Sequence, residues 1–266
     1  MGVEIKSIKE IEGVRVASQM AAETLLLVGE RLRAGMTTEE INTIVHEDTV
    51  RRGAVPAPLN YKGFPKSVCT SINDVVCHGI PGSEILRNGD IINVDVTTLY
   101  NGFHGDTSAT FYIGTPSAEA RLVTETARRA LELGIAEVRE GARLGDIGAA
   151  IQIFVEAQGC SVVRDFVGHG IGRRFHEPPQ VKHFGKRGDG QRLKTGMIFT
   201  VEPMVNLGRY EVDIDADDKW TVRTVDGELS AQFEHTVVVT RDGCEVLTRR
   251  KQPLRFSENV SAVFAM

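Results

Sequence analysis

Two aspartates lie in the most strand-like part of the sequence. Residues 91–114 read IINVDVTTLYNGFHGDTSATFYIG, with Asp95 and Asp106 among apolar and β-branched neighbours. The Asn-Gly pair between them predicts a β-hairpin with a type I′ turn, in which both turn residues take positive φ. A carboxylate in such a strand is costly to desolvate unless a partner compensates its charge. These aspartates are therefore the first candidates for chemistry.

The register of the predicted hairpin places both aspartates on one face. If Tyr100 pairs with Phe103, Asp95 stands opposite Ser108, and Asp106 lies two residues along on the same face. Diagonal neighbours of this kind have Cβ atoms about 7–8 Å apart. Two unpaired carboxylates at that spacing repel each other, and a cation between them removes the repulsion. The alternative is a pair of exposed acids on a solvent-facing side of the hairpin.

Three more ionisable residues occupy positions where strand packing favours apolar side chains. His169 stands between Gly168 and Gly170, where the backbone can approach a ligand closely. Glu202 ends a predicted strand, and Glu234 lies in the last one. Taken singly, each of these residues is more often structural than functional. Together with the two aspartates they form a recognisable set of metal ligands.

Alternation along the last predicted strand distinguishes a candidate ligand from a residue on the opposite face. Gln232, Glu234 and Thr236 share one face of the strand, whereas Phe233 and His235 share the other. His235 therefore points away from Glu234. We interpret His235 as a structural histidine.

Four carboxylates and one imidazole carry more negative charge than one divalent ion balances. Two ions about 3.5–4 Å apart, bridged by carboxylates, fit this set better. The oxygen-rich ligands favour Mn²⁺, Fe²⁺ or Co²⁺, with Zn²⁺ or Ni²⁺ as further options, and the imidazole disfavours Ca²⁺. The acidic stretch 211–218, EVDIDADD, lacks the glycine and glutamate of a calcium-binding loop. We interpret that stretch as a solvated loop.

Composition bounds the class of protein. The chain has 266 residues, of which 41% are apolar and 25% charged, as expected for a globular protein. The net charge of −5 and the lack of a basic block argue against nucleic-acid binding. There is no secretory signal and no run approaching the ~20 apolar residues of a membrane span. Four cysteines without a C-x-x-C pair indicate reduced thiols in a cytoplasmic protein.

Helical periodicity predicts a duplication. Helices are expected over 10–33 and 37–52, the second with capping-box spacing at Thr37 and Glu40, and again over 117–140 and 145–158. An offset of 106 residues aligns Leu25 with Leu131, Ile41 with Ile147, Gly35 with Gly141 and Gly53 with Gly159. Strands are expected over 66–72, 91–99, 105–113, 161–167, 197–202, 219–225 and 231–240. Helices segregated before strands predict an α+β fold, with helices covering one face of a curved, mainly antiparallel sheet.

Five motifs give the sequence a family resemblance that covers about residues 4–250. They are FPKSVCTSINDVVCHGIP, VDVTTLYNGFHGDTS, GHGIGRRFHEPPQV, TVEPM and SAQFEHT. In this combination the chain resembles the type I methionine aminopeptidases in their bacterial form. The resemblance implies a pita-bread fold, with two pseudo-symmetric halves around a dinuclear metal site. It also implies removal of the initiator methionine from nascent proteins and peptides whose second residue is small.

Roles for the ionisable residues follow from the resemblance. It implies that Asp106 and Glu234 bridge two ions, that Asp95 holds one, and that His169 and Glu202 hold the other. Glu202 would also transfer protons. His176 would stabilise the tetrahedral oxyanion, and His78 would contact the nitrogen of the scissile bond. The implied ligand set is thus the one that strand chemistry singles out.

The same motif matching implies a methionine pocket and a second cation. The substrate-binding residues are Tyr61, Phe64, Cys69, His78, Phe175, His176 and Trp220, with Pro58 nearby. For each aromatic residue alone, ordinary core packing is the alternative. A monovalent cation, Na⁺ or K⁺, is expected near Asn73, Val75 and Ser230.

The sequence also leads to expectations about domain organisation and partners. We expect one catalytic domain over 1–250, with halves of about 1–115 and 116–250, and a tail over 251–266 without an assigned role. Phe256 and Phe264 in that tail could dock onto the body, and the loop 207–219 is more acidic than the family pattern. Expected properties are a monomeric state, a cytoplasmic location, ribosome association and no membrane contact.

Two alternatives share the fold. One is a proline-specific aminopeptidase or dipeptidase, which usually has a large extra N-terminal domain. The other is a non-catalytic binding module, which would lack the ligands and have a basic surface.

Overall fold

Two pairs of helices repeat along the chain at the predicted offset. They are α1 (Ile8–Arg31) and α2 (Thr38–Arg51), then α3 (Ala118–Ala136) and α4 (Leu144–Ala157). The offset of 106 residues relates both ends of α2 to both ends of α4. Gly35 and Gly141, related in the same way, have φ of 87° and 85°, a region that favours glycine. The repeat predicted from the sequence is therefore present in the structure.

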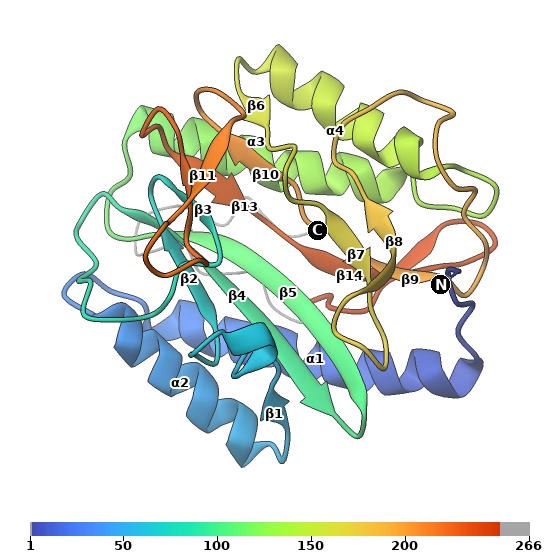
Figure 1. Cartoon of the computed structure of the whole chain (residues 1–266), viewed down its shortest axis with the longest axis horizontal. Helices are drawn as coiled ribbons and strands as arrows, with labels where there is room; N and C mark the ends of the chain where they lie inside the picture. Colours follow the sequence, from blue (N-terminus) through green and yellow to red (C-terminus); the bar gives the residue numbers. More distant parts are fainter. Residues whose placement is uncertain (1, 251–266) are drawn as a thin grey trace.

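The structure is a computed structural model that describes residues 2–250 (Figure 1). The tail 251–266, with Phe256 and Phe264, lies outside the described residues. No helix within 2–250 combines the length and apolar character that crossing a membrane requires.

Local side-chain bonds set where the helices begin. Thr37 Oγ1 accepts a hydrogen bond from the Glu40 N–H at 3.2 Å, and the Glu40 carboxylate accepts one from the Thr37 N–H at 2.7 Å. The predicted capping box of α2 is confirmed. Ser7 and Glu10 form a second capping box at the start of α1. These bonds satisfy amide groups that have no partner inside a helix.

The hairpin of β4 (Ile91–Tyr100) and β5 (Phe103–Tyr112) has the predicted register. Tyr100 pairs with Phe103, and Asp95 pairs with Ser108. The turn residues Asn101 and Gly102 have φ of 48° and 78°, as a type I′ turn requires. On its other edge β4 pairs with β1 (Val55–Pro56) and β2 (Cys69–Ile72).

The remaining strands are short and all their described pairs are antiparallel. They are β3 (Val75–Cys77), β6 (Ser161–Val162), β7 (Gly168–Gly170), β8 (Glu177–Val181), β9 (Ile198–Val201), β10 (Met204–Asn206), β11 (Val212–Ile214), β12 (Val222–Thr224), β13 (Ser230–Gln232), β14 (His235–Val239) and β15 (Cys244–Val246), with a 3₁₀ turn η1 (Tyr61–Gly63). The mainly antiparallel sheet arrangement is confirmed.

Four predicted strands differ from the observed ones. The strand expected over 66–72 begins only at Cys69, and the strand expected over 219–225 is shortened to β12. The strand expected over 161–167 is reduced to β6, and the strand expected over 231–240 is split into β13 and β14. The split occurs at Phe233 and Glu234. There the Glu234 N–H donates to the carbonyl of Ser108 in β5 at 3.1 Å instead of continuing the second-half ladder. The break therefore directs Glu234 toward the hairpin.

Helices lie outside and strands inside. In Figure 1, α1 and α2 flank the hairpin on one side, and α3 and α4 lie on the opposite side of the molecule. The contact between α1 and β5 is close enough to require glycine, because a Cβ on Gly105 would lie 2.2 Å from the Ser18 nitrogen. One buried apolar cluster includes Leu25 and Phe111 of the first half and Leu131 and Phe199 of the second. Both halves thus share a core while their inner strands remain free to form a site.

Candidate metal centre and substrate pocket

A cavity of about 280 Å³ collects the predicted site residues. All five candidate ligands line it, as do all seven candidate substrate-binding residues and Pro58: Asp95, Asp106, His169, Glu202 and Glu234, then Tyr61, Phe64, Cys69, His78, Phe175, His176 and Trp220. A cavity of this size suits one amino-acid side chain with adjoining backbone. The predicted ligands and the predicted substrate-binding residues therefore line the same cavity.

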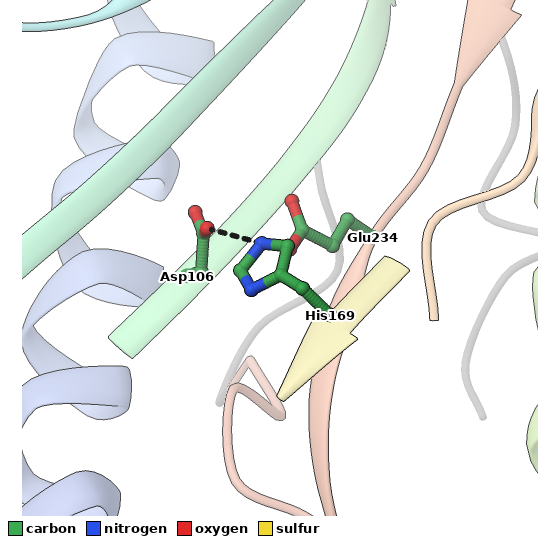
Figure 2. A group of neighbouring side chains, drawn as sticks. All are labelled: Asp106, His169 and Glu234. Carbon is green, nitrogen blue, oxygen red and sulfur yellow. Dashed lines mark ion pairs between the residues drawn. The ribbon is translucent and has the colours of Figure 1, made fainter. Parts of the chain in front are cut away.

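Three candidate ligands converge from three different strands or strand ends. Asp106 comes from β5, His169 from β7, and Glu234 from the break between β13 and β14 (Figure 2). One potential ligand atom from each lies within 4.8 Å of the other two. The His169 Nε2 atom is 3.7 Å from Asp106 Oδ2. This spacing allows one cation to contact all three side chains.

Glu202 and Asp95 extend the group. Glu202 follows β9, and its Oε1 atom lies 3.7 Å from His169 Nε2. The Glu202 carboxylate is held by the Thr200 hydroxyl at 2.5 Å and by the Gln232 amide at 3.3 Å. Asp95 lines the same cavity from β4. The five side chains therefore form one continuous polar wall.

Burial makes these carboxyl groups weaker acids than usual. Desolvation raises the pKa of Asp95 to about 6 and the pKa of Glu202 to about 8. The pKa values of Asp106 and Glu234 are raised well above the usual range, first by desolvation and then by repulsion from neighbouring carboxylates. Desolvation lowers the pKa of His169 to about 4, so its imidazole is neutral and can act as a ligand.

The unpartnered oxygens of the group fit a cation. Asp95 Oδ1 and Glu234 Oε1 are buried and have no hydrogen-bonding partner within residues 2–250. Such orphaned acceptors are uncommon in folded proteins and need an explanation, for example an ion. Four carboxylates with one neutral imidazole provide the oxygen and nitrogen donors that divalent transition metals accept. The residues present therefore fit a divalent metal site.

The glycines around His169 have a role in strand packing. A Cβ on Gly168 would lie 2.5 Å from the Thr200 carbonyl oxygen, and one on Gly170 would lie 2.1 Å from the Pro178 carbonyl oxygen. The expected close approach of this backbone to a ligand stays a prediction. Both glycines let the neighbouring strands pack against β7, which fixes the backbone of His169.

The last-strand residues separate as expected, with one exception. Gln232 and Glu234 line the cavity, and His235 Nδ1 lies 2.8 Å from Thr248 Oγ1 on another side. Thr236, expected on the Glu234 face, does not line the cavity. Its hydroxyl donates to the Asp106 carbonyl at 2.8 Å, and it therefore supports the hairpin.

Aromatic rings and histidines form the opposite wall. His176 Nδ1 lies 2.9 Å from Tyr61 Oη, and the His176 ring packs on His169 with centroids 4.1 Å apart. Phe175 contacts both Tyr61 and His176. The His78 ring meets Trp220 edge-on at 6.1 Å. The wall combines apolar surface with two ring nitrogens that can face a substrate.

The acidic loop has a structural role next to this wall. Asp218 Oδ1 accepts hydrogen bonds from the backbone N–H groups of Trp220 at 2.7 Å and Thr221 at 2.8 Å. Asp215 accepts from the Asp217 and Asp218 N–H groups in the same way. Part of the stretch therefore orders the turn before Trp220. The expectation of a loop is wrong for residues 212–214, which form β11 and pair with β12, although Asp213 is exposed as expected.

Sequence reasoning missed several residues of the cavity. They are Lys62, Cys77, Thr97, Asp165, Phe166, Val167 and Met204. Thr97 could have been found, because the hairpin register places it opposite Asp106, whose Oδ1 accepts from its hydroxyl at 2.7 Å. The others lie on short strands and loops without a periodic pattern. The four cysteines are free thiols, in agreement with the sequence.

The expected monovalent-cation residues lie apart from the cavity wall. Asn73, Val75 and Ser230 do not line it. They are neighbours in the fold, because the Ser230 N–H donates to the Asn73 carbonyl at 2.8 Å.

Comparison with known proteins places this geometry in a family. Residues 12–241 match metallopeptidase family M24. Methionine aminopeptidase A of Synechocystis is 53% identical over 92% of this chain and 97% of its own. The crystal structure of methionine aminopeptidase from Rickettsia prowazekii has a TM-score of 0.92 at 48% identity, covering 93% of this chain and all of its own.

A more distant likeness bears on the fold alone. The prolidase from Pyrococcus horikoshii has a TM-score of 0.75 at 20% identity, covering 94% of this chain and 65% of its own. The expected α+β pita-bread fold is confirmed by these neighbours, and the proline-specific alternative has only remote matches of this kind, at 20–23% identity. The chain therefore belongs to metallopeptidase family M24 and, within it, to the methionine aminopeptidases.

Proposed function

We propose that this chain hydrolyses the first peptide bond of proteins and peptides that begin with methionine followed by a small residue. The observation that supports this most strongly is the convergence of five candidate ligands and an aromatic pocket on one cavity of about 280 Å³. Relatives at about 50% identity are methionine aminopeptidases, which gives the substrate.

The acidic wall is proposed to hold two divalent ions, with Mn²⁺, Fe²⁺, Co²⁺, Zn²⁺ and Ni²⁺ as candidates. Asp106 and Glu234 would contact both ions, Asp95 one of them, and His169 with Glu202 the other. When bound, such ions supply Lewis acidity and lower the pKa of a water molecule toward neutrality. The orphaned oxygens of Asp95 and Glu234 support this assignment.

Chain residues are proposed to move and hold protons around the scissile bond. Glu202, which lies 3.7 Å from His169 in the acidic wall, would in its ionised form accept a proton and return it to the leaving amine. If the Tyr61 hydroxyl donates to His176 Nδ1, the Nε2–H of His176 is left to donate to the developing oxyanion. Burial lowers the pKa of His78 to about 4, so this imidazole would contact the scissile nitrogen in its neutral form.

The opposite wall is proposed to select methionine. Tyr61, Phe64, Phe175 and Trp220 provide polarizable surface, and Cys69 closes the pocket. An unbranched thioether adapts to such a pocket and gains from sulfur–aromatic contacts. Branched or charged side chains would fit less well.

The extent of the catalytic unit, its partners, its location and a monovalent-cation site are also part of the proposal. We propose one catalytic unit over 1–250, which the shared apolar core supports, with nascent polypeptide N-termini as partners. A monomeric state, a cytoplasmic location, ribosome association, and a Na⁺ or K⁺ site near Asn73, Val75 and Ser230 belong to the same proposal.

The deciding experiment measures methionine release from Met-Ala-Ser and Met-Gly-Met-Met. Chelated protein should be inactive, and adding Mn²⁺ or Co²⁺ should restore release. Activity that survives exhaustive chelation would refute metal-assisted hydrolysis. Faster cleavage of X-Pro peptides than of Met-Ala peptides would favour a proline-specific enzyme of the same fold.

A further inference from the structure

The segment before α1 is fastened to the body of the protein at Lys6. The Lys6 backbone N–H donates to the Gly196 carbonyl at 2.9 Å. Its side chain turns inward, and the residue is only 6% exposed. A lysine is rarely buried to this extent unless a partner compensates its charge.

The partner of Lys6 is Glu177, the residue after His176. The ammonium and the Glu177 carboxylate form an ion pair in which both side chains are 3% exposed. Burial would lower the pKa of Lys6, but hydrogen bonds to Glu177 and Glu4 raise it on balance. Lys6 therefore stays charged, and removing it would leave the buried Glu177 charge without its closest cation.

The ion pair packs directly against the start of the segment 172–177. A Cβ on Gly172 would lie 2.9 Å from Lys6 Nζ and 3.2 Å from Glu177 Oε1. The Gly172 carbonyl also accepts the backbone N–H of His104 in β5 at 2.8 Å. One end of the segment is thus held by the hairpin, and the other end by Lys6.

Between these two fixed points lie Phe175 and His176, which line the cavity. His176 is partly open to solvent, and one side of its ring packs on other side chains. Its described contacts are the Tyr61 hydroxyl and the rings of Tyr61, His169 and Phe175. The position of its backbone is set by the segment whose end at Glu177 is held by the ion pair and by the pairing of Gly170 with Glu177 in β7 and β8.

We propose that Lys6 is a positioning residue, which through its ion pair with Glu177 fixes the backbone that presents His176 and Phe175 to the cavity. Lys6 does not itself line the cavity, so it acts only through this segment. The inference rests on the proposed function, in which His176 stabilises the oxyanion.

The expected size of the effect follows from the need for aligned donors. Displacing a catalytic group by about 1 Å can cost roughly 100-fold in rate. Lys6→Met keeps the length of the side chain and removes its charge. We expect kcat for Met-Ala-Ser to fall about 10- to 100-fold. The affinity for Mn²⁺ alone, measured by calorimetry, should stay within about 3-fold, because no candidate ligand contacts Lys6. Lys9→Met, an exposed lysine three positions along, is the matched control and should leave kcat unchanged.

A double-mutant cycle with His176→Ala separates positioning from general damage. If Lys6 acts through His176, Lys6→Met should cost no more than about 3-fold in the His176→Ala background, because the coupled residues are non-additive. The same loss in both backgrounds would overturn the proposal. Should Lys6→Met fail to fold, Glu177→Gln gives the same cycle, since it keeps the shape of the side chain and leaves Lys6 a neutral acceptor.

The cycle also distinguishes failure of the inference from failure of the proposed function. If His176→Ala alone leaves kcat unchanged, the proposed role of His176 is wrong, and the inference falls with it. If His176→Ala is slow but Lys6→Met and Glu177→Gln retain full kcat, the proposed function stands and Lys6 has no positioning role.

Discussion

Two regions of the molecule bury carboxyl groups equally deeply but shift their pKa values in opposite directions. Asp48 in α2 is 3% exposed, and Asp106 and Glu234 in the cavity are 3% and 2% exposed. Asp48 Oδ2 accepts from Arg52 Nε at 2.7 Å and from the Thr24 hydroxyl at 2.8 Å. Burial would raise the pKa of Asp48, but these bonds lower it on balance. The cavity carboxyls have raised pKa values instead.

The difference teaches that burial alone does not mark a functional acid. At Asp48 the chain supplies its own cation, and the result is a structural ion pair. In the cavity the attraction of Arg250 offsets the pKa rise of Glu234 only in part. The Arg250 guanidinium donates instead to Thr107 Oγ1 and the Ser108 carbonyl, both at 3.1 Å. A buried acid cluster that its own chain leaves unbalanced is where an external cation is expected.

The largest expected effect comes from Asp106→Asn. Loss of this carboxylate removes a proposed ligand of both ions, so methionine release should fall about 1,000-fold or more. The chelated protein should not lose stability, because the substitution removes one of several repelling carboxyls. Peptide assays with added Mn²⁺ and urea unfolding with chelator measure the two effects. A chelated Asp106→Asn protein that is clearly less stable than the parent would remove the contrast with Asp48.

His235→Ala is the matched control in the adjoining strand. His235 is one residue from Glu234 but contacts Thr248, so its loss should lower the free energy of unfolding by about 2 kcal/mol. The value of kcat per folded molecule should stay within about 5-fold, far less than the loss expected for the ligand. Equal catalytic losses at Asp106 and His235 would contradict the assignment of strand faces.

Asp48→Asn tests the ion-paired acid of the comparison, and its expected effect is smaller. The amide cannot balance Arg52, and it weakens a charge-assisted hydrogen bond in a buried position. We expect the free energy of unfolding to fall by about 1–2 kcal/mol, with unchanged kcat. Urea unfolding at neutral pH and the Met-Ala-Ser assay give both values. A catalytic loss larger than that of His235→Ala would show that an ion pair within the chain does not mark a buried acid as structural.

Local rules explain which parts of this fold could be predicted from the sequence. The Asn101-Gly102 turn fixes the hairpin register, and the register places Asp95 and Asp106 together. Capping residues such as Thr37 fix helix starts to within a residue or two. These features depend on residues close in sequence, so the sequence predicts them well.

Non-local contacts explain what the sequence did not predict. Strands of three residues such as β7 have no readable alternation and exist because neighbouring strands pair with them. The break at Glu234 results from its bond to Ser108, and the burial of Lys6 results from Glu177. The metal-bridging roles and the methionine pocket were implied by family motifs and not by residue spacing. Physical reasoning reached the ligand types, and resemblance supplied their roles.

The smallest expected effect is a pH dependence with opposite signs in the two regions. A carboxyl with a raised folded-state pKa, such as Glu202 at about 8, contributes stability below its unfolded value of 4.5 and loses it as pH rises. Asp48, with a lowered pKa, contributes stability above 3.8 and loses it only in acid. Between about pH 7 and about pH 8 the histidines oppose this loss, because unfolded histidine still binds some protons there and the folded-state pKa values of six histidines are lowered. A Glu202→Gln variant keeps these histidines and therefore isolates the carboxyl.

In that window the chelated protein should lose about 1 kcal/mol more unfolding free energy than the chelated Glu202→Gln variant as pH rises, whereas Asp48 contributes a constant amount to both. Saturating Mn²⁺ should remove the loss, because the ionised carboxylates are the form that binds metal. Urea unfolding at both pH values, with and without Mn²⁺, measures this difference. If the chelated protein and the chelated Glu202→Gln variant change equally in stability between the two pH values, the cavity acids are already balanced within the chain, and the contrast with Asp48 loses its physical basis.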